Sequence, residues 1–279
     1  MTTSIGIIGM GAMGAGVAAR LVSNGLEVRT SIKGRGAETK NRATKAGVRL
    51  LDLGEVCKAQ IVLSIVPPAE AMNVALEVAA ALKDAKDKPI FVDCNAISVD
   101  SVKDIAVVMR ESGIPFVDGG IIGFPPSEKA QPTLYVAGEH ASRVAELSAS
   151  GLNVRPIDGP IGSASALKMS YAGINKGMVM LISSMILAAD RAGAAGALKQ
   201  ELSVSRPELI ERMNRSIPDM FSKAARWAPE MEEISEFTKE DKNLAAVFES
   251  FSEICKSIAG DYAGPKKSIA VLADFTRQP

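Results

Sequence analysis

The chain has 279 residues, 47% of them hydrophobic, and its 32 basic residues are balanced by 32 acidic ones. This length suits one large domain or two ordinary ones, with enough apolar residues for a core that needs no disulfides. Zero net charge gives no general attraction to nucleic acid or to an anionic membrane. The three cysteines lack metal-ligand spacing. The single histidine, His140, lies in a polar Gly-Glu-His stretch that predicts a surface turn, which argues against a zinc site or a Ser-His-Asp triad. We therefore expect a cytoplasmic protein with reduced thiols and no metal site.

The N-terminal segment predicts a dinucleotide-binding turn. A short apolar strand, 5–8, runs into a Gly-x-Gly-x-x-Gly sequence and then into a helical pattern over 12–23. In such a turn the first glycine allows the sharp bend, the second lets a pyrophosphate approach, and the third lets the helix pack on the strand. The alternative is a glycine-rich turn that only packs a helix on a sheet. The predicted cofactor contacts here are Gly9, Met10, Gly11, Ala12, Met13 and Gly14.

The second strand, 27–31, indicates which cofactor the turn binds. An NAD site usually has an acidic residue at the end of this strand, to bind the ribose hydroxyls. Here Glu27 stands at the strand's start, and the end carries Ser31, Lys33 and Arg35. A hydroxyl and two cations suit the 2′-phosphate of NADP. The alternative is a solvated loop with ordinary surface charges. We predict NADP as the cofactor.

Strands and helices go on alternating as far as residue 158, which predicts a doubly wound, Rossmann-type parallel sheet. The expected strands are 61–66, 90–94, 115–118, 133–137 and 154–157, and the expected helices are 37–46, 69–82 and 101–111. Ligands bind outside the carboxyl ends of such strands. We therefore expect the nicotinamide near Val66, Pro67 and Asn95. The residues expected to flank the substrate are Gly120, Ile121, Ile122 and Gly123.

The remainder, 159–279, predicts an all-α domain that begins with one long helix over 163–192. Amphipathic segments follow as far as residue 273, punctuated by Pro207, Pro218, Pro229 and Pro265. The apolar run 178–189 is too short to span a bilayer. This small, Met- and Ala-rich domain would leave much apolar surface in water, which predicts a homodimer.

Three polar residues of the long helix are the candidate catalytic group. Lys168, Tyr171 and Asn175 follow i, i+3, i+7 spacing and share one helical face among small or apolar neighbours. A semi-buried lysine favours its neutral form and suits proton transfer. Asn175 could orient the lysine or a substrate oxygen, and Tyr171 could donate a proton. The alternative is a lysine that extends from an apolar helix to water.

These segments resemble the β-hydroxyacid dehydrogenase superfamily, which includes 6-phosphogluconate and 3-hydroxyisobutyrate dehydrogenases. Residues 9–14 match its opening, 93–98 resemble its segment near the nicotinamide, and 162–168 match the segment with its catalytic lysine. The sequence 165–171 is most similar to a branch with a short, 6-phosphogluconate-dehydrogenase-like C-terminal domain. The resemblance implies an NADP-dependent oxidoreductase that transfers hydride between the nicotinamide and a small hydroxy acid or related alcohol, with Lys168 as general acid and base.

Two departures from the family pattern leave alternatives open. In the substrate motif, Ile122 replaces a serine that helps to hold the substrate carboxylate, and Phe124 replaces a glycine. The asparagine expected four residues after the lysine is Ala172. Residues 117–126 also resemble NADPH-dependent imine reductases, which generally lack this lysine and use an aspartate or tyrosine nearby; Tyr171 would then be the proton donor. A protein that binds NADP without catalysis is a third possibility.

Overall fold

The computed structural model describes residues 4–277, and the chain divides into two compact units, Met1–Lys168 and Met169–Pro279. The sequence placed the division ten residues earlier, between 158 and 159. The difference arises at the helix α7 (Ser163–Arg191), whose first turns pack on a strand of the first unit. A Cβ at Gly120 would lie 2.6 Å from the Ala164 carbonyl oxygen. The start of α7 is therefore part of the first unit.

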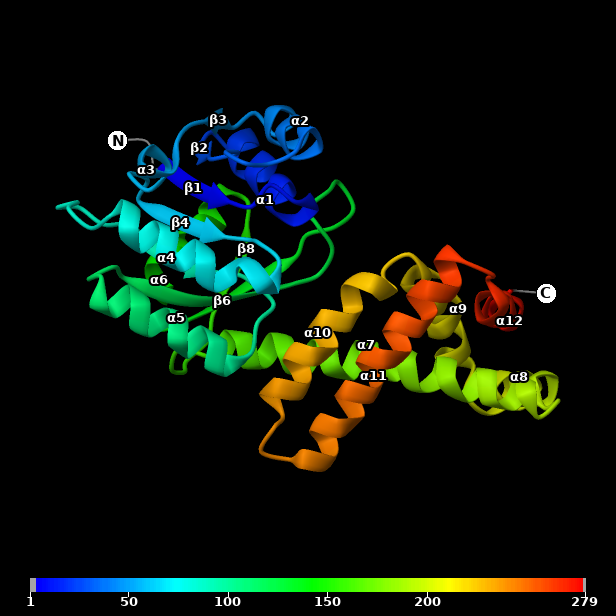
Figure 1. Cartoon of the computed structure of the whole chain (residues 1–279). Coiled ribbons are helices and arrows are strands. Elements are labelled where there is room, and N and C mark those ends of the chain that lie inside the picture. Colours follow the sequence, from blue (N-terminus) through cyan, green and yellow to red (C-terminus); the bar gives the residue numbers. More distant parts are fainter. Residues whose placement is uncertain (1–3, 278–279) are drawn as a thin grey trace. The chain divides into compact units, whose positions relative to one another are not determined.

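The first unit is built on an eight-stranded sheet with the order β3-β2-β1-β4-β5-β6-β7-β8 (Figure 1). All neighbouring strands are parallel except β6 and β7, so the predicted doubly wound sheet is confirmed. The exposed two-residue strand β3 was not predicted. The strands are β1 (Ser4–Ile8), β2 (Glu27–Thr30), β3 (Arg49–Leu50), β4 (Ile61–Ser64), β5 (Ile90–Asp93), β6 (Phe116–Ile122), β7 (Thr133–Ala137) and β8 (Asn153–Pro156).

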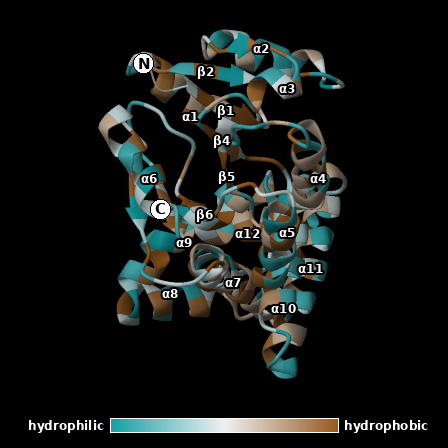
Figure 2. Ribbon diagram, turned by 90° about the vertical axis from the view of Figure 1, so that its left-hand side faces the viewer, coloured by the Kyte–Doolittle hydropathy of each residue, from teal (hydrophilic) through white to brown (hydrophobic). Residues whose placement is uncertain are grey.

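Helices cover both faces of this sheet. The elements are α1 (Ala12–Ser23), α2 (Ala37–Lys45), α3 (Leu53–Val56), η1 (Pro68–Glu70), α4 (Ala71–Ala81), α5 (Val99–Glu111), α6 (Ala141–Ala145) and η2 (Glu146–Ser150). One apolar cluster packs α1, α2 and α6 on the sheet, and a second packs α3, α4 and α5 on the opposite face. On β4, Ile61 and Leu63 enter the first cluster and Val62 the second, as the alternation of side chains along a strand requires. In Figure 2 the inner strands β1 and β4 are largely brown, whereas β2, which carries Glu27 and Arg29, is teal.

The second unit is entirely helical over its described residues, as predicted. After α7 come α8 (Ala195–Ser205), α9 (Pro207–Phe221), α10 (Ala224–Phe237), α11 (Lys242–Ala263) and α12 (Lys267–Thr276). The helices α10 and α11 lie side by side along their length (Figure 1). Pro207 begins a helix, where its missing N–H costs nothing. The expectation that Pro218 and Pro229 separate helices is wrong, because both lie inside helices that the surrounding packing holds together.

By length and composition, α7 could cross a membrane: it has 29 residues, and its most apolar window has a mean hydropathy of 1.5. The helix α7 is longer than the apolar run 178–189, which by itself is too short to span a bilayer. A core helix of a soluble protein meets the same criterion, and Met180, Ser183 and Ile186 on α7 are fully buried. These residues make one side of α7 part of the core of the second unit.

Candidate cofactor and catalytic site

The positions of the turn after β1 need glycine for different structural reasons. Gly9 has a φ of +100°, and a Cβ there would lie 2.2 Å from the carbonyl oxygen of Ile65. A Cβ at Gly14 would lie 1.9 Å from the carbonyl oxygen of Gly9. Both glycines are therefore required by the fold itself. A Cβ at Gly11 would meet no atom of residues 4–277 within 4 Å. The fold leaves this position open, and an approaching ligand is what a glycine there accommodates.

The start of α1 fits the phosphates of a dinucleotide. Gly11 is the N-cap residue and has no side chain with which to cap the first turn. Gly11 and Ala12 are exposed, so the N–H groups of the first turn are accessible to an anion. The side chain of Met10 is buried, and that of Met13 is partly buried. Met10 and Met13 would thus contact a bound phosphate through their backbone. Ala12 and the glycines form the exposed surface at the start of α1.

The polar turn after β2 contains the residues predicted to recognise a 2′-phosphate. Lys33 and Arg35 are exposed, Ser31 is partly buried, and Gly34 at the tip has a φ of +74°. Sequence reasoning missed a further cation, Arg42, whose Nε donates a 2.8 Å hydrogen bond to the carbonyl oxygen of Met10. This bond joins α2 to the glycine turn. No sequence motif indicates this contact, because it is the packing of α2 that brings Arg42 to the glycine turn.

The predicted nicotinamide rim is held together by one side chain. The Oδ1 of Asn95 accepts a 2.6 Å hydrogen bond from the backbone N–H of Val66. Its Nδ2 donates to Asp93 at 2.7 Å and to the hydroxyl of Ser64 at 3.1 Å. The structure thus brings Val66 and Asn95 together at the ends of β4 and β5. Pro67 follows them as the exposed residue before η1.

Three fully buried polar residues form a row across the sheet beneath this rim. Ser64, Asp93 and Asp118 are in register on β4, β5 and β6. Burial raises the pKa of Asp93 to about 6, although the hydrogen bonds from Asn95 act in the opposite direction. Burial also raises the pKa of Asp118. Such carboxylates persist in a core only where donors surround them.

The donors around Asp118 come from the start of α7. Its Oδ2 accepts hydrogen bonds from the backbone N–H groups of Gly162, Ala164 and Ser165 at 2.9, 2.9 and 3.1 Å. Its Oδ1 accepts one from the hydroxyl of Ser165 at 2.6 Å. A carboxylate at this position satisfies the unpaired N–H groups of the helix and matches its positive end. Asp118 therefore fixes the first turn of α7 to β6.

This attachment sets the position of Lys168, which lies in the second turn of α7. Its Nζ donates a 3.4 Å hydrogen bond to the carbonyl oxygen of Cys94, the residue that follows β5. A Cβ at Gly120 would lie 3.3 Å from the Cβ of Lys168, so glycine is needed for α7 to come this close. The lysine is partly buried, as predicted, and it lies beside the backbone that leads to Asn95.

The four residues expected to flank the substrate do not all face the lysine. Side chains alternate along β6, so Gly120 and Ile122 point to the same face as Asp118. Ile121 points to the opposite face, where it is buried in the core. Gly123 follows the strand with a φ of +125°, packed against Pro132. We correct the expectation for Ile121 accordingly: its side chain is packing, because the strand turns it away from Lys168.

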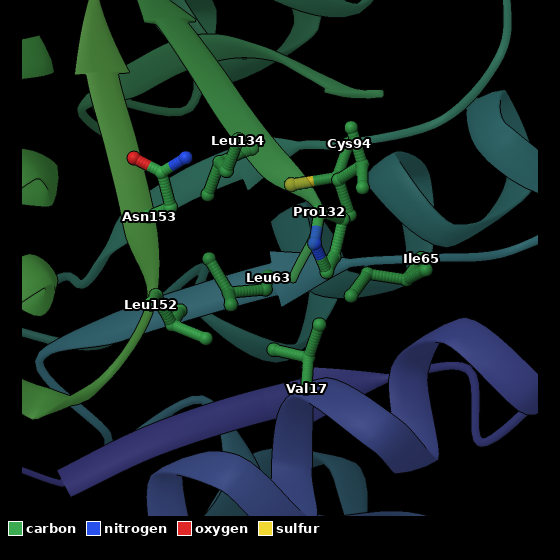
Figure 3. A pocket seen from close by; sticks show the side chains of 9 residues that line it. Val17, Leu63, Ile65, Cys94, Pro132, Leu134, Leu152 and Asn153 are labelled. Atoms are coloured by element: carbon green, nitrogen blue, oxygen red, sulfur yellow. The ribbon is translucent and has the colours of Figure 1, made fainter. Parts of the chain in front are cut away.

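Ile121 instead lines a small cavity on the other face of the sheet, with Cys94 and the residues shown in Figure 3. The cavity holds about 20 Å³, which is room for roughly one water molecule. Figure 3 shows the sulfur of Cys94 pointing into it. Burial raises the pKa of this thiol far above its usual range. The thiol of Cys94 is therefore an unreactive, structural group.

Tyr171 and Asn175 belong to the second unit. The side chain of Tyr171 is 52% exposed. The amide of Asn175 is hydrogen-bonded at both ends: its Nδ2 donates to the carbonyl oxygen of Tyr171 at 2.8 Å, and its Oδ1 accepts from Arg212 on α9. The helix keeps both residues on the face predicted from their spacing, while Arg212 is a partner that the sequence did not indicate.

Comparison with known proteins places this geometry in a family. Residues 4–148 match the NAD-binding domain of 6-phosphogluconate dehydrogenase, and residues 189–258 match a domain of unknown function, DUF1932. A conserved protein of unknown function, MTH1747, whose structure is described as similar to 3-hydroxyacid dehydrogenases, is 26% identical. The match covers 92% of this chain and 99% of that one, with a TM-score of 0.69.

Two more distant structures share the fold. The 3-hydroxyisobutyrate dehydrogenase of Mycobacterium tuberculosis, solved with L-serine, is 19% identical over 98% of this chain and 99% of its own, with a TM-score of 0.75. An imine reductase variant from Myxococcus stipitatus, solved with NAD+, is 18% identical over 99% of this chain and 100% of its own, with a TM-score of 0.60. The predicted resemblance is confirmed: the chain belongs to the β-hydroxyacid dehydrogenase-like family that carries the NAD-binding domain of 6-phosphogluconate dehydrogenase.

Proposed function

We propose that the protein is an NADP-dependent oxidoreductase that transfers hydride between the nicotinamide and a small hydroxy acid or related alcohol or carbonyl. The observation that carries the proposal is the position of Lys168. Its ammonium group lies at the carboxyl end of β5, beside the rim formed by Val66 and Asn95. A proton-transfer group and a nicotinamide site at one rim are what alcohol oxidation needs.

The chain's own residues have separate tasks in this reaction. The glycine turn and the start of α1 would hold the pyrophosphate, and Ser31, Lys33 and Arg35 would surround a 2′-phosphate. The bound cofactor supplies the hydride acceptor or donor. In the oxidative direction the unprotonated amine of Lys168 takes the hydroxyl proton, and in the reductive direction the ammonium group returns it to the carbonyl oxygen.

A second candidate, imine reduction, has one specific observation in its favour. Tyr171 follows Lys168 by one helical turn, and its phenol is well exposed. In this version the phenol donates the proton, and the proton-transfer role of Lys168 is lost. The two candidates differ in which single substitution, at Lys168 or at Tyr171, abolishes turnover.

We also propose that the protein is a cytoplasmic homodimer. On α7 the large apolar side chains of Ile174, Leu181 and Met185 are 66%, 55% and 57% exposed. Their spacing of seven and then four residues forms a stripe along the helix, the pattern that pairs helices. Light scattering should give twice the chain mass of 29.3 kDa. A monomeric mass would contradict the dimer but would not test the proposed reaction.

The function is tested by following NADPH absorbance while the full chain is given small panels of β-hydroxy acids, aldehydes and cyclic imines. Oxidation or reduction of a hydroxy acid pair that depends on Lys168 would support the proposal. Imine reduction that depends on Tyr171 would support the second candidate. Nucleotide binding without any turnover would indicate the non-catalytic alternative.

A further inference from the structure

Arg42 of α2 holds the carbonyl group of Met10 in the glycine turn. Its Nε donates a 2.8 Å hydrogen bond to that oxygen. The regular hydrogen bonds of α1 begin one residue later, where the N–H of Ala15 donates to the carbonyl oxygen of Gly11 at 2.9 Å. The carbonyl of Met10 therefore precedes the hydrogen bonds of the helix, and a side chain from another element supplies its donor.

This bond fixes a peptide group that lies next to flexible positions. Met10 stands between Gly9 and Gly11, and glycine gives the backbone more freedom than other residues do. The buried side chain of Met10 anchors its Cα, but it does not set the plane of the peptide that joins Met10 to Gly11. A trans peptide is planar, so a carbonyl held toward α2 directs the N–H of Gly11 away from α2. Arg42 therefore sets the orientation of that N–H group.

The guanidinium of Arg42 is itself held on α2. One of its N–H groups donates to the carboxylate of Glu38, one helical turn earlier, in an ion pair. Another donates to the hydroxyl of Thr39 at 3.3 Å. Ala43, the next residue along α2, is fully buried in the apolar cluster that also contains Met10. The guanidinium is thus preorganised for its bond to the turn, which reduces the conformational entropy that the bond costs.

The pair with Glu38 distinguishes Arg42 from the cations of the turn after β2. Lys33 and Arg35 are exposed. The side chain of Arg42 is only 31% exposed, and the carboxylate of Glu38 compensates its charge. A compensated charge attracts a phosphate less strongly than a free one does. The hydrogen bond to the main chain is therefore the contribution that Arg42 is placed to make.

We propose that Arg42 is a positioning residue for the cofactor: it holds the Met10–Gly11 peptide so that the glycine turn presents its N–H groups to the pyrophosphate. This inference rests on the proposed function and adds a residue that acts on the part common to NADP and NAD. It gives Arg42 no contact with the 2′-phosphate, which is left to the turn after β2. Removing Arg42 should therefore weaken the binding of both nucleotides by the same factor.

The test is fluorescence titration of the full chain and of Arg42→Gln with NADPH and with NADH. The variant should bind each nucleotide at least about fivefold more weakly, the effect of one hydrogen bond, while the ratio of the two affinities keeps its wild-type value. Adenosine 2′-monophosphate has the 2′-phosphate but no pyrophosphate, so its affinity, measured by displacement of NADPH, should not change. The matched control is Lys45→Gln, which removes the same charge from an exposed position of the same helix and should bind as the wild type does.

Arg42→Lys is a second variant for the case in which Arg42→Gln fails to fold. It keeps the charge and the aliphatic stem but lacks the Nε–H donor, so it should lose affinity for both nucleotides as well. Wild-type affinity in either Arg42 variant, a loss confined to NADPH, an equal loss for adenosine 2′-monophosphate, or the same loss in Lys45→Gln would overturn the inference. No binding of either nucleotide by the wild type would instead refute the proposed function.

Discussion

The carboxylate of Asp118 and the hydroxyl of Ser165 share a 2.6 Å hydrogen bond, although 47 residues separate them in the sequence. With the three backbone bonds to the same carboxylate, this contact fixes the start of α7 to the sheet. Lys168 lies one turn beyond Ser165. The position of the proposed proton-transfer group is therefore set by a buried charge on β6.

Removing this charge should loosen both the helix and the lysine. We expect Asp118→Ala to lower the free energy of unfolding by at least about 3 kcal/mol, because three N–H groups and a hydroxyl lose their acceptor. Ser165→Ala removes only one donor and should cost about 1 kcal/mol. Urea unfolding of the three proteins measures both effects. Equal stability of Asp118→Ala and wild type would show that the carboxylate does not hold α7.

Lys168→Ala should reduce turnover at least about a hundredfold, the usual range for a general acid or base. NADPH binding should persist, because none of the proposed phosphate contacts is altered. The control is Lys103→Ala, whose side chain is 60% exposed on α5. Turnover is measured with whichever substrate the panel identifies. Normal turnover of Lys168→Ala would remove the lysine from the mechanism and direct attention to Tyr171.

Substitutions of the glycines in the turn should distinguish an effect on folding from an effect on cofactor binding. Gly11→Ala meets no protein atom, so its thermal unfolding midpoint should match that of the wild type, while NADPH affinity falls at least about tenfold. Gly9→Ala should unfold at a lower temperature, because its Cβ meets the backbone at Ile65 and its φ is positive. Unchanged NADPH binding by Gly11→Ala would contradict the placement of the pyrophosphate.

The buried carboxyl of Asp93 should make stability depend on pH in a defined direction. Its pKa is about 6 in the folded protein, against an ordinary value of 3.8 for an aspartate in water, so between these values the folded state binds the extra proton. The contribution of Asp93 to the free energy of unfolding therefore falls as the pH rises from about 4 to about 6, and it stays constant above that range. The shift of roughly two pKa units corresponds to on the order of 3 kcal/mol.

The comparison with Asp93→Asn isolates this effect, because asparagine does not titrate. The wild type's free energy of unfolding, taken relative to that of the variant, should decrease between about pH 4 and about pH 6. Urea unfolding at a series of pH values measures the difference. A difference that stays constant over the range would mean that the carboxyl is not perturbed by burial.

Much of the first unit could be predicted from its sequence. The helix 12–23 and the long helix starting at 163 have the predicted N-terminal bounds, because the glycine turn and the apolar periodicity are local signals. The strand β6 was predicted to end at Asp118 but continues to Ile122. Gly119 and Gly120 have low strand propensity, and pairing with β7 carries the strand through them.

The parts that could not be predicted depend on contacts between distant segments. Arg42 and Arg212 belong to no motif, and each is defined by one hydrogen bond to another element. Pro218 and Pro229 looked like helix breaks because local propensity disfavours proline inside a helix. The helical packing of the second unit overrides that preference.

The most direct test of the account is a fluorescence titration of the full chain with NADPH and, in parallel, with NADH. We expect saturable binding of both nucleotides, with NADPH bound at least about tenfold more tightly, because the 2′-phosphate adds a charged contact. A Lys33→Ala, Arg35→Ala double variant should reduce the difference in affinity between NADPH and NADH without weakening the binding of NADH. Tighter binding of NADH would contradict the assignment of the 2′-phosphate site, and no binding of either nucleotide would contradict the account as a whole.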